Sequence, residues 1–454
     1  MSNKIKLVCV LALLCGLMVG VSACGGGSDS SSGSDTGSAE TGSSETGSSE
    51  TESASSDASG KITVWDVFYK LFPEYTKAVK PLDEAFEKTY PNVTVEHVAQ
   101  GYEQYPALVQ AAFTAREGPD VMMMLPSYAG VLNYYQGLEE LNDRITPEMQ
   151  EQLKYWYTMT PGYEEEGPHY GVPIGSTDFI FYYNKALFKK AGLPTNFEPK
   201  TWDEVREAGE KLKAAGIQPF SGGDKEGYED QWWWMLGWPT VNTKEQSVEL
   251  GEGEIPFTSD TFAKAWGPEE MMEEAGLLEE DRFTTPFFTE GYEKFSEGKG
   301  GMTLGGSTTV AYWGEFNKAL GEKNVGVFYS PGASYVTASA EYGWSIPKFA
   351  ENKDAAWAYL EFMSSKPAAE MLFEKAGLLP NRKDVTLPTD APEQARQIVD
   401  LYEENETFDD AAHLMPIQTA LQLSAEAREY FQGRMSMEEM QQNLQESYEK
   451  ERKK

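Results

Sequence analysis

The stretch 170-YGVPIGSTDFIFYYNKALFKKAGL-193 lies near the middle of a chain of 454 residues. Its segment DFIFYYN, residues 178–184, is a short apolar and aromatic run, which is typical of a buried strand. Shortly afterwards Thr201 and Glu204 have the spacing of a capping box, which predicts a helix start. GIQPF at 216–220 resumes the strand pattern. The order of strand, helix and strand indicates an α/β unit.

The same alternation occurs earlier in the chain. Strand patterns stand at KITVWDV, VTVEHV and DVMMML, residues 61–67, 93–98 and 120–125, and helix patterns separate them at residues 81–90 and 105–115. This order favours an α/β architecture with a largely parallel sheet, in which ligands bind outside the carboxyl ends of the strands. Beyond about residue 350 the chain is mostly helical and ends in a helix that Ser436 and Glu439 open with capping-box spacing.

The composition limits which functions are possible. The chain is 40% apolar and 13% aromatic, which suits a large core and, at this length, two domains more than one. Its formal net charge is -35. Such a charge opposes binding to nucleic acid or to an anionic membrane surface at long range.

The N-terminus has the pattern of an export signal. MSNKIK is short and basic, the apolar run 7–21 is too short for a comfortable membrane span, and VSAC places small residues before Cys24. The VSAC ending resembles the lipobox of bacterial lipoproteins, which implies a signal peptide over 1–23 and a lipid on Cys24. The other cysteines, Cys9 and Cys15, would be removed, so no internal disulfide is possible. An uncleaved anchor helix is the alternative.

Residues 25–59 consist only of Gly, Ser, Thr, Ala, Asp and Glu. A segment with nothing to bury is predicted to be disordered, so residues 24–60 are interpreted as a lipidated cysteine followed by a tether. The protein is therefore expected at the extracellular face of the cell membrane, held only by its lipid, as in a Gram-positive bacterium.

Several motifs follow one another in a fixed order. They are KITVWD, REGPDVMMM, the stretch 170–193 with TWDE after it, EGKGGMTLGGS, EYGWSIPK, NKDAAWAYLEFMSS, GLLPNRKD and GRMSMEEM. Together they resemble one family: the extracellular solute-binding proteins of ABC importers, in the carbohydrate branch that includes maltose-binding protein. The resemblance covers nearly all of residues 61–454. The central stretch departs from the usual pattern at Gly175 and Ile180, which makes transfer of a relative's substrate unsafe.

The resemblance implies a two-lobed fold of the periplasmic-binding-protein type, each lobe a mixed sheet flanked by helices, with a ligand cleft at the hinge. Lobe 1 would be residues 61–173 plus 333–378, and lobe 2 residues 178–331 plus 380–454. The chain would cross between them near GVPIG, SPGAS and LLPN, where Gly and Pro suit a hinge. The implied function is capture of a sugar or oligosaccharide and its delivery to the permease subunits of an ABC importer. The protein is expected to be a monomer, not an enzyme, and to need no cofactor.

Sugar binding also accounts for the aromatic and acidic composition. A pyranose ring has an apolar face and a rim of hydroxyls, so its site needs flat aromatic side chains together with polar groups in the plane of the ring. The segment 230-DQWWWMLGWPT-240 supplies such groups. Consecutive helical residues point about 100° apart, so Trp234 and Trp238 are predicted to share a core face, while Trp232 and Trp233, with Asp230 or Gln231, are predicted to contact sugar.

The remaining candidate ligand residues come from matching motifs. Each has a plainer alternative: packing for the aromatic residues, capping for Thr177 and Asp178, a core position for Trp344, and an ordinary ion pair for Arg382. Thr308 stands where many relatives have an aromatic residue, which shifts the prediction to Ser307 and Trp344. The full set is Asp66, Tyr69, Glu103, Ser127, Tyr128, Thr177, Asp178, Ser307, Trp344 and Arg382.

Other chemistry has little support in the sequence. The histidines are three and far apart, and no HExxH, GxSxG or phosphate-binding glycine pattern occurs. No metal site is expected, and Glu164, Glu165 and Glu166 are interpreted as a solvated loop. The rival functions are a surface-anchored carbohydrate-active enzyme, which needs a carboxylate pair, and an adhesin or sensor that binds sugar without transport.

Overall fold

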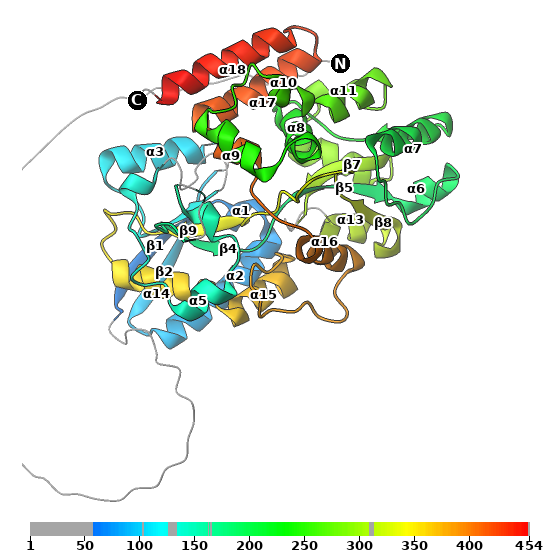
Figure 1. The fold of residues 1–454 in the computed structure, drawn as a ribbon. Helices are drawn as coiled ribbons and strands as arrows, with labels where there is room; N and C mark the ends of the chain where they lie inside the picture. Colours follow the sequence, from blue (N-terminus) through cyan, green and yellow to red (C-terminus); the bar gives the residue numbers. More distant parts are fainter. Residues whose placement is uncertain are drawn as a thin grey trace, which may run out of the picture. The chain divides into compact units, whose positions relative to one another are not determined.

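The computed structural model describes residues 58–101, 104–125, 134–161, 163, 166–307 and 313–452. They lie within one compact unit, Ala54–Lys454, drawn in Figure 1. Cys24 and residues 25–57 lie outside the described residues. The strands are β1 (Gly60–Asp66), β2 (Val93–Ala99), β3 (Val121–Met124), β4 (Val172–Ile174), β5 (Phe179–Asn184), β6 (Gln218–Phe220), β7 (Gly300–Gly306), β8 (Val325–Phe328) and β9 (Tyr342–Ser345).

Helices make up most of the remaining chain. Those of the first half are α1 (Phe68–Leu71), α2 (Pro73–Thr89), α3 (Tyr105–Ala115), α5 (Pro147–Gln152), α6 (Lys185–Lys190), α7 (Trp202–Ala214) and α8 (Tyr228–Val241). Those of the second half are α9 (Lys244–Glu252), α10 (Asp260–Lys264), α11 (Gly267–Glu274), α12 (Tyr292–Ser296), α13 (Trp313–Leu320), α14 (Lys353–Met363), α15 (Lys366–Ala376), α16 (Glu393–Glu404), α17 (Ile417–Phe431) and α18 (Met437–Arg452). The predicted caps are confirmed, since Thr201 accepts the Glu204 N–H and Ser436 accepts the Glu439 N–H.

The described strands form two separate mixed sheets. The first has the order β2-β1-β3-β9-β4 and the second the order β6-β7-β5-β8. In the first, β1 is parallel to β2 and β3, whereas β9 is antiparallel to both β3 and β4. In the second, only β6 and β7 are parallel. The expectation of a largely parallel sheet therefore fits the first sheet, in which only β9 runs against the other four strands. It is wrong for the second sheet, because β5 pairs antiparallel on both sides.

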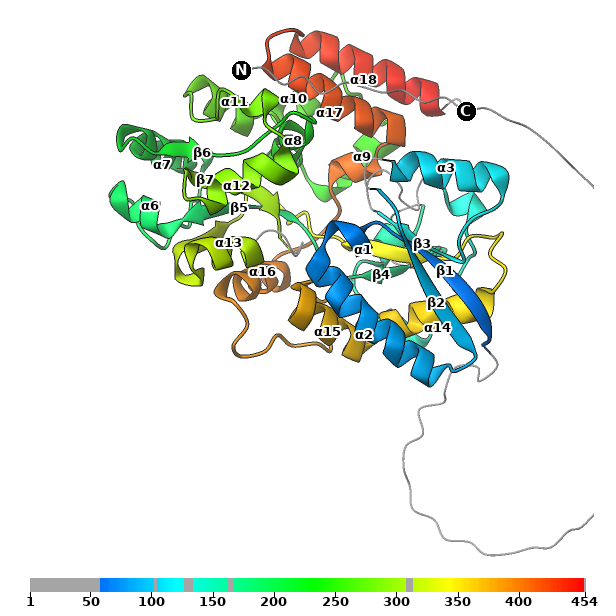
Figure 2. The same ribbon diagram turned by 180° about the vertical axis from the view of Figure 1, so that it is seen from behind.

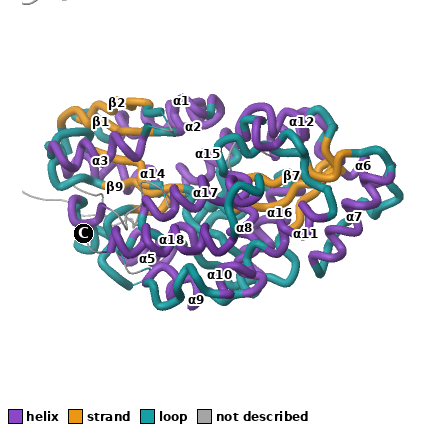
Figure 3. The backbone as a smooth tube through the Cα atoms, turned by 90° about the horizontal axis from the view of Figure 1, so that it is seen from above, coloured by secondary structure: helices purple, strands orange, loops and turns teal. Residues whose placement is uncertain are grey.

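Helices cover both sheets and bury their apolar faces. α14 contacts β1 and β4, and α2 contacts β2, so these two helices lie along the first sheet (Figure 2). α8 contacts β5, and α17 contacts both α8 and α18. α12 contacts β7, α7 contacts β6 and α6 contacts β5, so these three helices lie against the second sheet (Figure 3). α8 is buried on nearly all sides, which fits its part 232–238, where the sequence is apolar on every face.

Three chain segments connect the two sheets, and they are hydrogen-bonded to one another. The first runs from β4 to β5, the second from β8 to β9, and the third from α15 to α16. The Ser176 N–H donates to the Leu379 carbonyl at 2.7 Å, and Thr177 and Ser339 exchange backbone hydrogen bonds at 2.9 and 3.0 Å. Residues far apart in the sequence thus form a short ladder where the chain passes from one sheet to the other.

Gly175 in the first connecting segment gives a test of this ladder. Its φ is +67°, and a Cβ there would lie 2.8 to 3.0 Å from side-chain atoms of Leu378 in the third segment. We predict that Gly175→Ala lowers the free energy of unfolding by about 2 kcal/mol or more, because strain and a clash add. The measurement is urea unfolding.

Gly192→Ala is the matched control for that substitution. Gly192 has a φ of +75° and open space around its added Cβ, so only the backbone strain applies, about 1 kcal/mol. Equal losses in the two variants would contradict the close contact between the connecting segments.

Candidate functional site

One edge of the first sheet collects the predicted residues of lobe 1. β1, β2 and β3 run parallel, and β4 shares their direction because both β3 and β4 are antiparallel to β9. Their carboxyl ends therefore meet at one edge. Asp66 ends β1, and Tyr69 follows in α1. Glu103, Ser127 and Tyr128 follow β2 and β3 but lie outside the described residues.

The second sheet has a matching edge. The start of β5 pairs with the end of β7, as Phe179 opposes Gly306. β6 runs parallel to β7, and its last residue, Phe220, pairs with Met302 near the start of β7. Asp178 and Ser307 therefore lie together, and the turn after β6 leads into α8 with its tryptophans.

The two edges are joined by residues 175–178. β4 ends at Ile174 at the first edge and β5 starts at Phe179 at the second. A chain of this length spans at most about 18 Å. The site predicted from the motifs therefore corresponds to two polar sheet edges that a short, hydrogen-bonded connection holds near each other.

Asp178 is the centre of a buried polar network. Its Oδ1 accepts hydrogen bonds from the Phe179 N–H at 2.6 Å and from the Thr337 hydroxyl at 2.5 Å. Its own N–H donates to Ser307 Oγ at 2.8 Å, and Ser307 Oγ lies 2.7 Å from the Tyr402 hydroxyl. Asp178 Oδ2 is buried and has no hydrogen-bond partner. Asp178 Oδ1 and Ser307 Oγ are thus engaged inside the protein, while one oxygen of the Asp178 carboxyl stays unused.

A second acid, Asp410, lies in the same electrostatic environment. It precedes the short helix Ala411–Leu414 and its Oδ1 is buried without a hydrogen-bond partner. Burial, then Asp178 and Asp409, raise the pKa of Asp410 well above its usual range. Burial raises the pKa of Asp178 too, although hydrogen bonds from Thr337 and the Phe179 N–H lower it. No neighbouring cation contributes to the pKa shift of either carboxyl.

Thr177 is half-buried and lies in the ladder between the connecting segments. Asp66 is fully buried, and its Oδ1 accepts the N–H groups of Phe68 and Tyr69 at 2.8 and 3.1 Å. Asp66 thus orients α1. Because it is buried, it supports Tyr69 through the backbone of that helix. Tyr69 is half-buried, and its ring is stacked on His97 with centroids 4.6 Å apart.

The four tryptophans of α8 have different surroundings. Trp234 and Trp238 are fully buried with ring centroids 5.1 Å apart, which confirms their predicted core pairing. Trp233 is also in the core, against Phe181 and Phe220, so it has no surface to offer a ligand. Trp232 is 8% exposed.

Trp232 itself is largely covered by aromatic neighbours. Its ring is stacked on Phe179 at 4.2 Å and on Tyr228 at 6.2 Å, and Phe287 contacts it edge-on at 4.6 Å. Phe179 and Tyr228 are half-buried. Trp232 therefore supports an aromatic cluster whose accessible ring area belongs to Phe179 and Tyr228, two residues that the motif comparison did not select.

Asp230 is part of an internal ion cluster instead of a ligand site. Arg282 Nη1 donates to Asp230 Oδ1 and to Glu269 Oε1, both at 2.8 Å, and all three side chains are buried. Burial first, then Asp230, raises the pKa of both Asp224 and Glu269 well above the usual range. The prediction for Asp230 is corrected on this evidence, because its carboxylate is already neutralised by Arg282.

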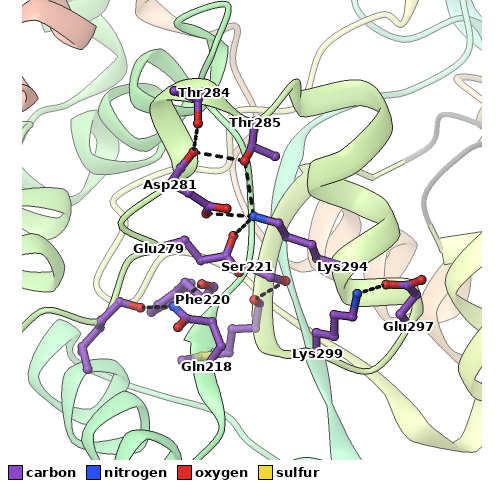
Figure 4. A network of polar contacts seen from close by, with 12 residues as sticks. Gln218, Phe220, Ser221, Glu279, Asp281, Thr284, Thr285, Lys294, Glu297 and Lys299 are labelled. Atoms are coloured by element: carbon purple, nitrogen blue, oxygen red, sulfur yellow. Dashed lines mark hydrogen bonds and ion pairs between the residues drawn. The ribbon is translucent and has the colours of Figure 1, made fainter. Parts of the chain in front are cut away.

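Gln231 is likewise engaged inside the protein, since it accepts a hydrogen bond from the Ser424 hydroxyl of α17. A neighbouring network binds Lys294 of α12 to Glu279, Asp281 and Thr285 (Figure 4). The hydrogen bond from Ser424 ties the start of α8 to α17, and the Lys294 contacts tie α12 to residues 279–285.

Trp344 lies in the core and Arg382 forms an ion pair, the alternatives given for these two residues. Trp344 is fully buried in the core of the first sheet against Tyr342 and Tyr359. Arg382 donates twice to Asp384 at 2.8 Å and once to the Ser364 carbonyl at 2.8 Å. The structure does not bring either side chain to the sheet edges as a free ligand group.

Within the described ranges, no group of three or more His, Cys, Asp or Glu side chains has a metal-binding arrangement. The same ranges contain no helix that is long and apolar enough to cross a membrane.

Comparisons with known proteins agree with this arrangement. The model of the bacterial extracellular solute-binding protein family matches residues 69–370. The chain is 32% identical over 154 residues to an sn-glycerol-3-phosphate-binding periplasmic protein of Brucella abortus, which covers 31% of this chain and 34% of that protein. The aligned part thus spans about a third of that relative's length.

Two solved structures show the fold across the whole body. A chitin oligosaccharide binding protein has a TM-score of 0.76 at 20% identity, with 86% of this chain and 98% of that one covered. A maltose-bound protein of T. maritima has a TM-score of 0.67 at 21% identity, with 86% and 99% covered. The predicted two-lobed α/β fold is confirmed.

Glu229 at the start of α8 predicts a pH dependence of stability. Burial raises its pKa from 4.5 to about 7, with Arg282 lowering it and Asp230 raising it. A raised carboxyl pKa contributes stability below about pH 4.5 that is lost as pH rises through 7. We expect the free energy of unfolding to fall by about 2 to 3 kcal/mol between pH 5 and 8 from this group.

Glu229→Gln keeps the neutral form, so its urea unfolding should lose that part of the pH dependence. Glu290→Gln, at an exposed position, is the control and should behave like the wild type. A pH profile unchanged by Glu229→Gln would contradict the assignment.

Proposed function

Because the chain belongs to the bacterial extracellular solute-binding protein family, we propose that it is a lipid-anchored receptor that binds a neutral sugar or oligosaccharide between its two lobes and delivers it to an ABC importer. The lobes are those expected from the motifs, 61–173 plus 333–378 and 178–331 plus 380–454. Cys24 carries the lipid and residues 25–59 are the tether.

The observation that carries the proposal is the meeting of two polar sheet edges at the ladder of connecting segments. One edge supplies the half-buried ring of Tyr69, and the other supplies Phe179 and Tyr228. Asp178 Oδ2 adds a buried acceptor without a partner. Aromatic faces with an acceptor in reach of hydroxyls match a pyranose ring.

The charges at these edges favour a neutral ligand over an anion. The curated relative from Brucella is named for sn-glycerol-3-phosphate, so a phosphate ester is the second candidate. Both arginines that are buried in the described part of the chain already bind carboxylates, Arg282 with Asp230 and Arg382 with Asp384. No cation contributes to the pKa shift of Asp178 or Asp410, so an anion beside them would lack a charge partner.

Closure of the two lobes follows from the position of the ligand. A ligand that contacts both edges has a higher affinity for the closed form, and only such differential affinity shifts the equilibrium. The connecting segments absorb the motion, and Gly175 and Gly332, with φ of +67° and +78°, supply the backbone freedom that a hinge uses.

Asp178→Asn tests the acceptor with little change in shape. The amide keeps Oδ1 with its two hydrogen bonds and replaces the unused Oδ2 by a donor. We predict that saccharide affinity, measured by calorimetry, falls about 10- to 100-fold, because the ligand hydroxyl loses the acceptor Oδ2 and is left buried without a partner. The thermal midpoint should stay near that of the wild type.

Asp224→Asn is the matched control. Asp224 also uses Oδ1 to accept backbone N–H groups, those of Glu229 and Asp230, and has a buried Oδ2 without a partner, but it belongs to the Arg282 cluster. It should leave saccharide affinity unchanged. If Asp178→Asn binds saccharide as tightly as Asp224→Asn does, Asp178 is no ligand residue.

Small-angle scattering tests closure. We expect the radius of gyration to decrease when a saturating oligosaccharide is added, and to stay constant with glycerol-3-phosphate.

Chromatography of the same samples should show the oligosaccharide intact, since the protein binds without converting its ligand. Released shorter products would support the rival function of a carbohydrate-active enzyme.

A further inference from the structure

Tyr69 is held in place at three points although its side chain is half-buried. Its N–H donates to Asp66 Oδ1 at 3.1 Å. Its carbonyl accepts a hydrogen bond from the Thr76 hydroxyl of α2. One face of its ring is stacked on His97, with 4.6 Å between centroids and 12° between planes. A short helix such as α1 is not stable by itself, so these contacts fix the position of Tyr69.

His97 lies between two carboxylates, one near each ring nitrogen. It belongs to β2, and its side chain is only 2% exposed. Nδ1 lies 3.3 Å from Asp66 Oδ2, and Nε2 lies 3.1 Å from Asp83 Oδ2 of α2. Nε2 is also 3.0 Å from the hydroxyl of Tyr359 in α14, which itself donates to Asp83 at 2.9 Å. Carboxylates on both sides of the ring stabilise the doubly protonated imidazolium.

The charged ring and the tyrosine make one unit. An imidazolium stacked on a phenol ring is attracted by the negative face of the aromatic ring, as in other cation–π pairs. The same Asp66 that pairs with His97 also holds the Tyr69 N–H, so the backbone and the ring of Tyr69 are fixed by one group of side chains from β1, β2 and α2.

We infer that His97 is a positioning residue for ligand binding: it holds Tyr69 so that the ring face opposite His97 forms the aromatic contact of lobe 1 with a saccharide. This inference rests on the proposed function. Neither His97 nor Asp83 touches the ligand in this arrangement; both act through Tyr69. An aromatic face fixed before binding lowers the entropic cost of stacking a sugar on it.

The arrangement implies a pH dependence of binding. Burial lowers the pKa of His97, but the hydrogen bonds and charges of Asp66 and Asp83 outweigh it and raise the pKa to about 9. The pKa of Tyr69 is raised above 10.0 by burial and by Asp83 and Asp66. His97 therefore loses its proton before Tyr69 does. Saccharide affinity should be constant from pH 6 to 8 and weaken as pH passes 9.

A double-mutant cycle separates positioning from a general effect on the fold. Saccharide affinity is measured by calorimetry for the wild type, His97→Gln, Tyr69→Ala and the double variant. At pH 7 we expect His97→Gln to bind about three- to tenfold more weakly, as loss of a stacked cation suggests. In the Tyr69→Ala background, His97→Gln should lower saccharide affinity at most about twofold, because the ring that His97 positions is absent.

The outcomes are distinct. An equal loss from His97→Gln with and without Tyr69, or a wild-type affinity that stays constant from pH 8 to 9.5, overturns the inference and leaves the proposed function intact. The pH profile uses the unaltered protein, so it holds even if His97→Gln folds poorly. Failure of every neutral saccharide to bind overturns the proposed function instead.

A structural comparison without ligand completes the test. In crystal structures of the ligand-free wild type and His97→Gln, we expect the Tyr69 ring to keep its place in the first and to leave it in the second. A ring that is unmoved in His97→Gln overturns the positioning role whether or not any saccharide binds.

Discussion

The backbone hydrogen bonds of Ser176 and Thr177 to Leu379 and Ser339 tie the first connecting segment to two others that lie more than 150 residues further along the chain. Everything proposed for the site depends on this ladder. It sets the carboxyl edge of the first sheet near the edge of the second that carries Asp178, Phe179 and Ser307. Side chains add to it, since Ser176 Oγ donates to the Pro380 carbonyl and Asn381 Nδ2 to the Pro173 carbonyl. The ladder thus constrains where the chain crosses.

Buried charge supports the two edges in different ways. On the first, the imidazolium of His97 is neutralised by Asp66 and Asp83 and orients α1. On the second, Arg282 neutralises Asp230 and Glu269 and fixes the start of α8. Charges paired in this way are tolerated in the interior. Asp178 and Asp410 differ, since no neighbouring cation contributes to the pKa shift of either carboxyl, which marks them as the polar groups to explain by function.

Much of the fold could be predicted from sequence, because strand patterns, caps and motif order are local signals. The pairing of Trp234 with Trp238 followed from helix geometry alone. Long-range partners could not be predicted. The acid Asp230 looks like a sugar ligand until Arg282, 52 residues away, is seen to neutralise it. Likewise His97 shows no sign of its role, since its carboxylates lie 31 and 14 positions away. A single sequence does not encode such distances in any readable pattern.

The central claim is that the ligand is a neutral saccharide. Its most direct test is the thermal unfolding midpoint of the intact protein with a panel of neutral oligosaccharides, amino sugars and glycerol-3-phosphate, since a ligand of the native state raises the midpoint by mass action. The account predicts a concentration-dependent rise with at least one neutral oligosaccharide and none with glycerol-3-phosphate. A rise with glycerol-3-phosphate alone would contradict it.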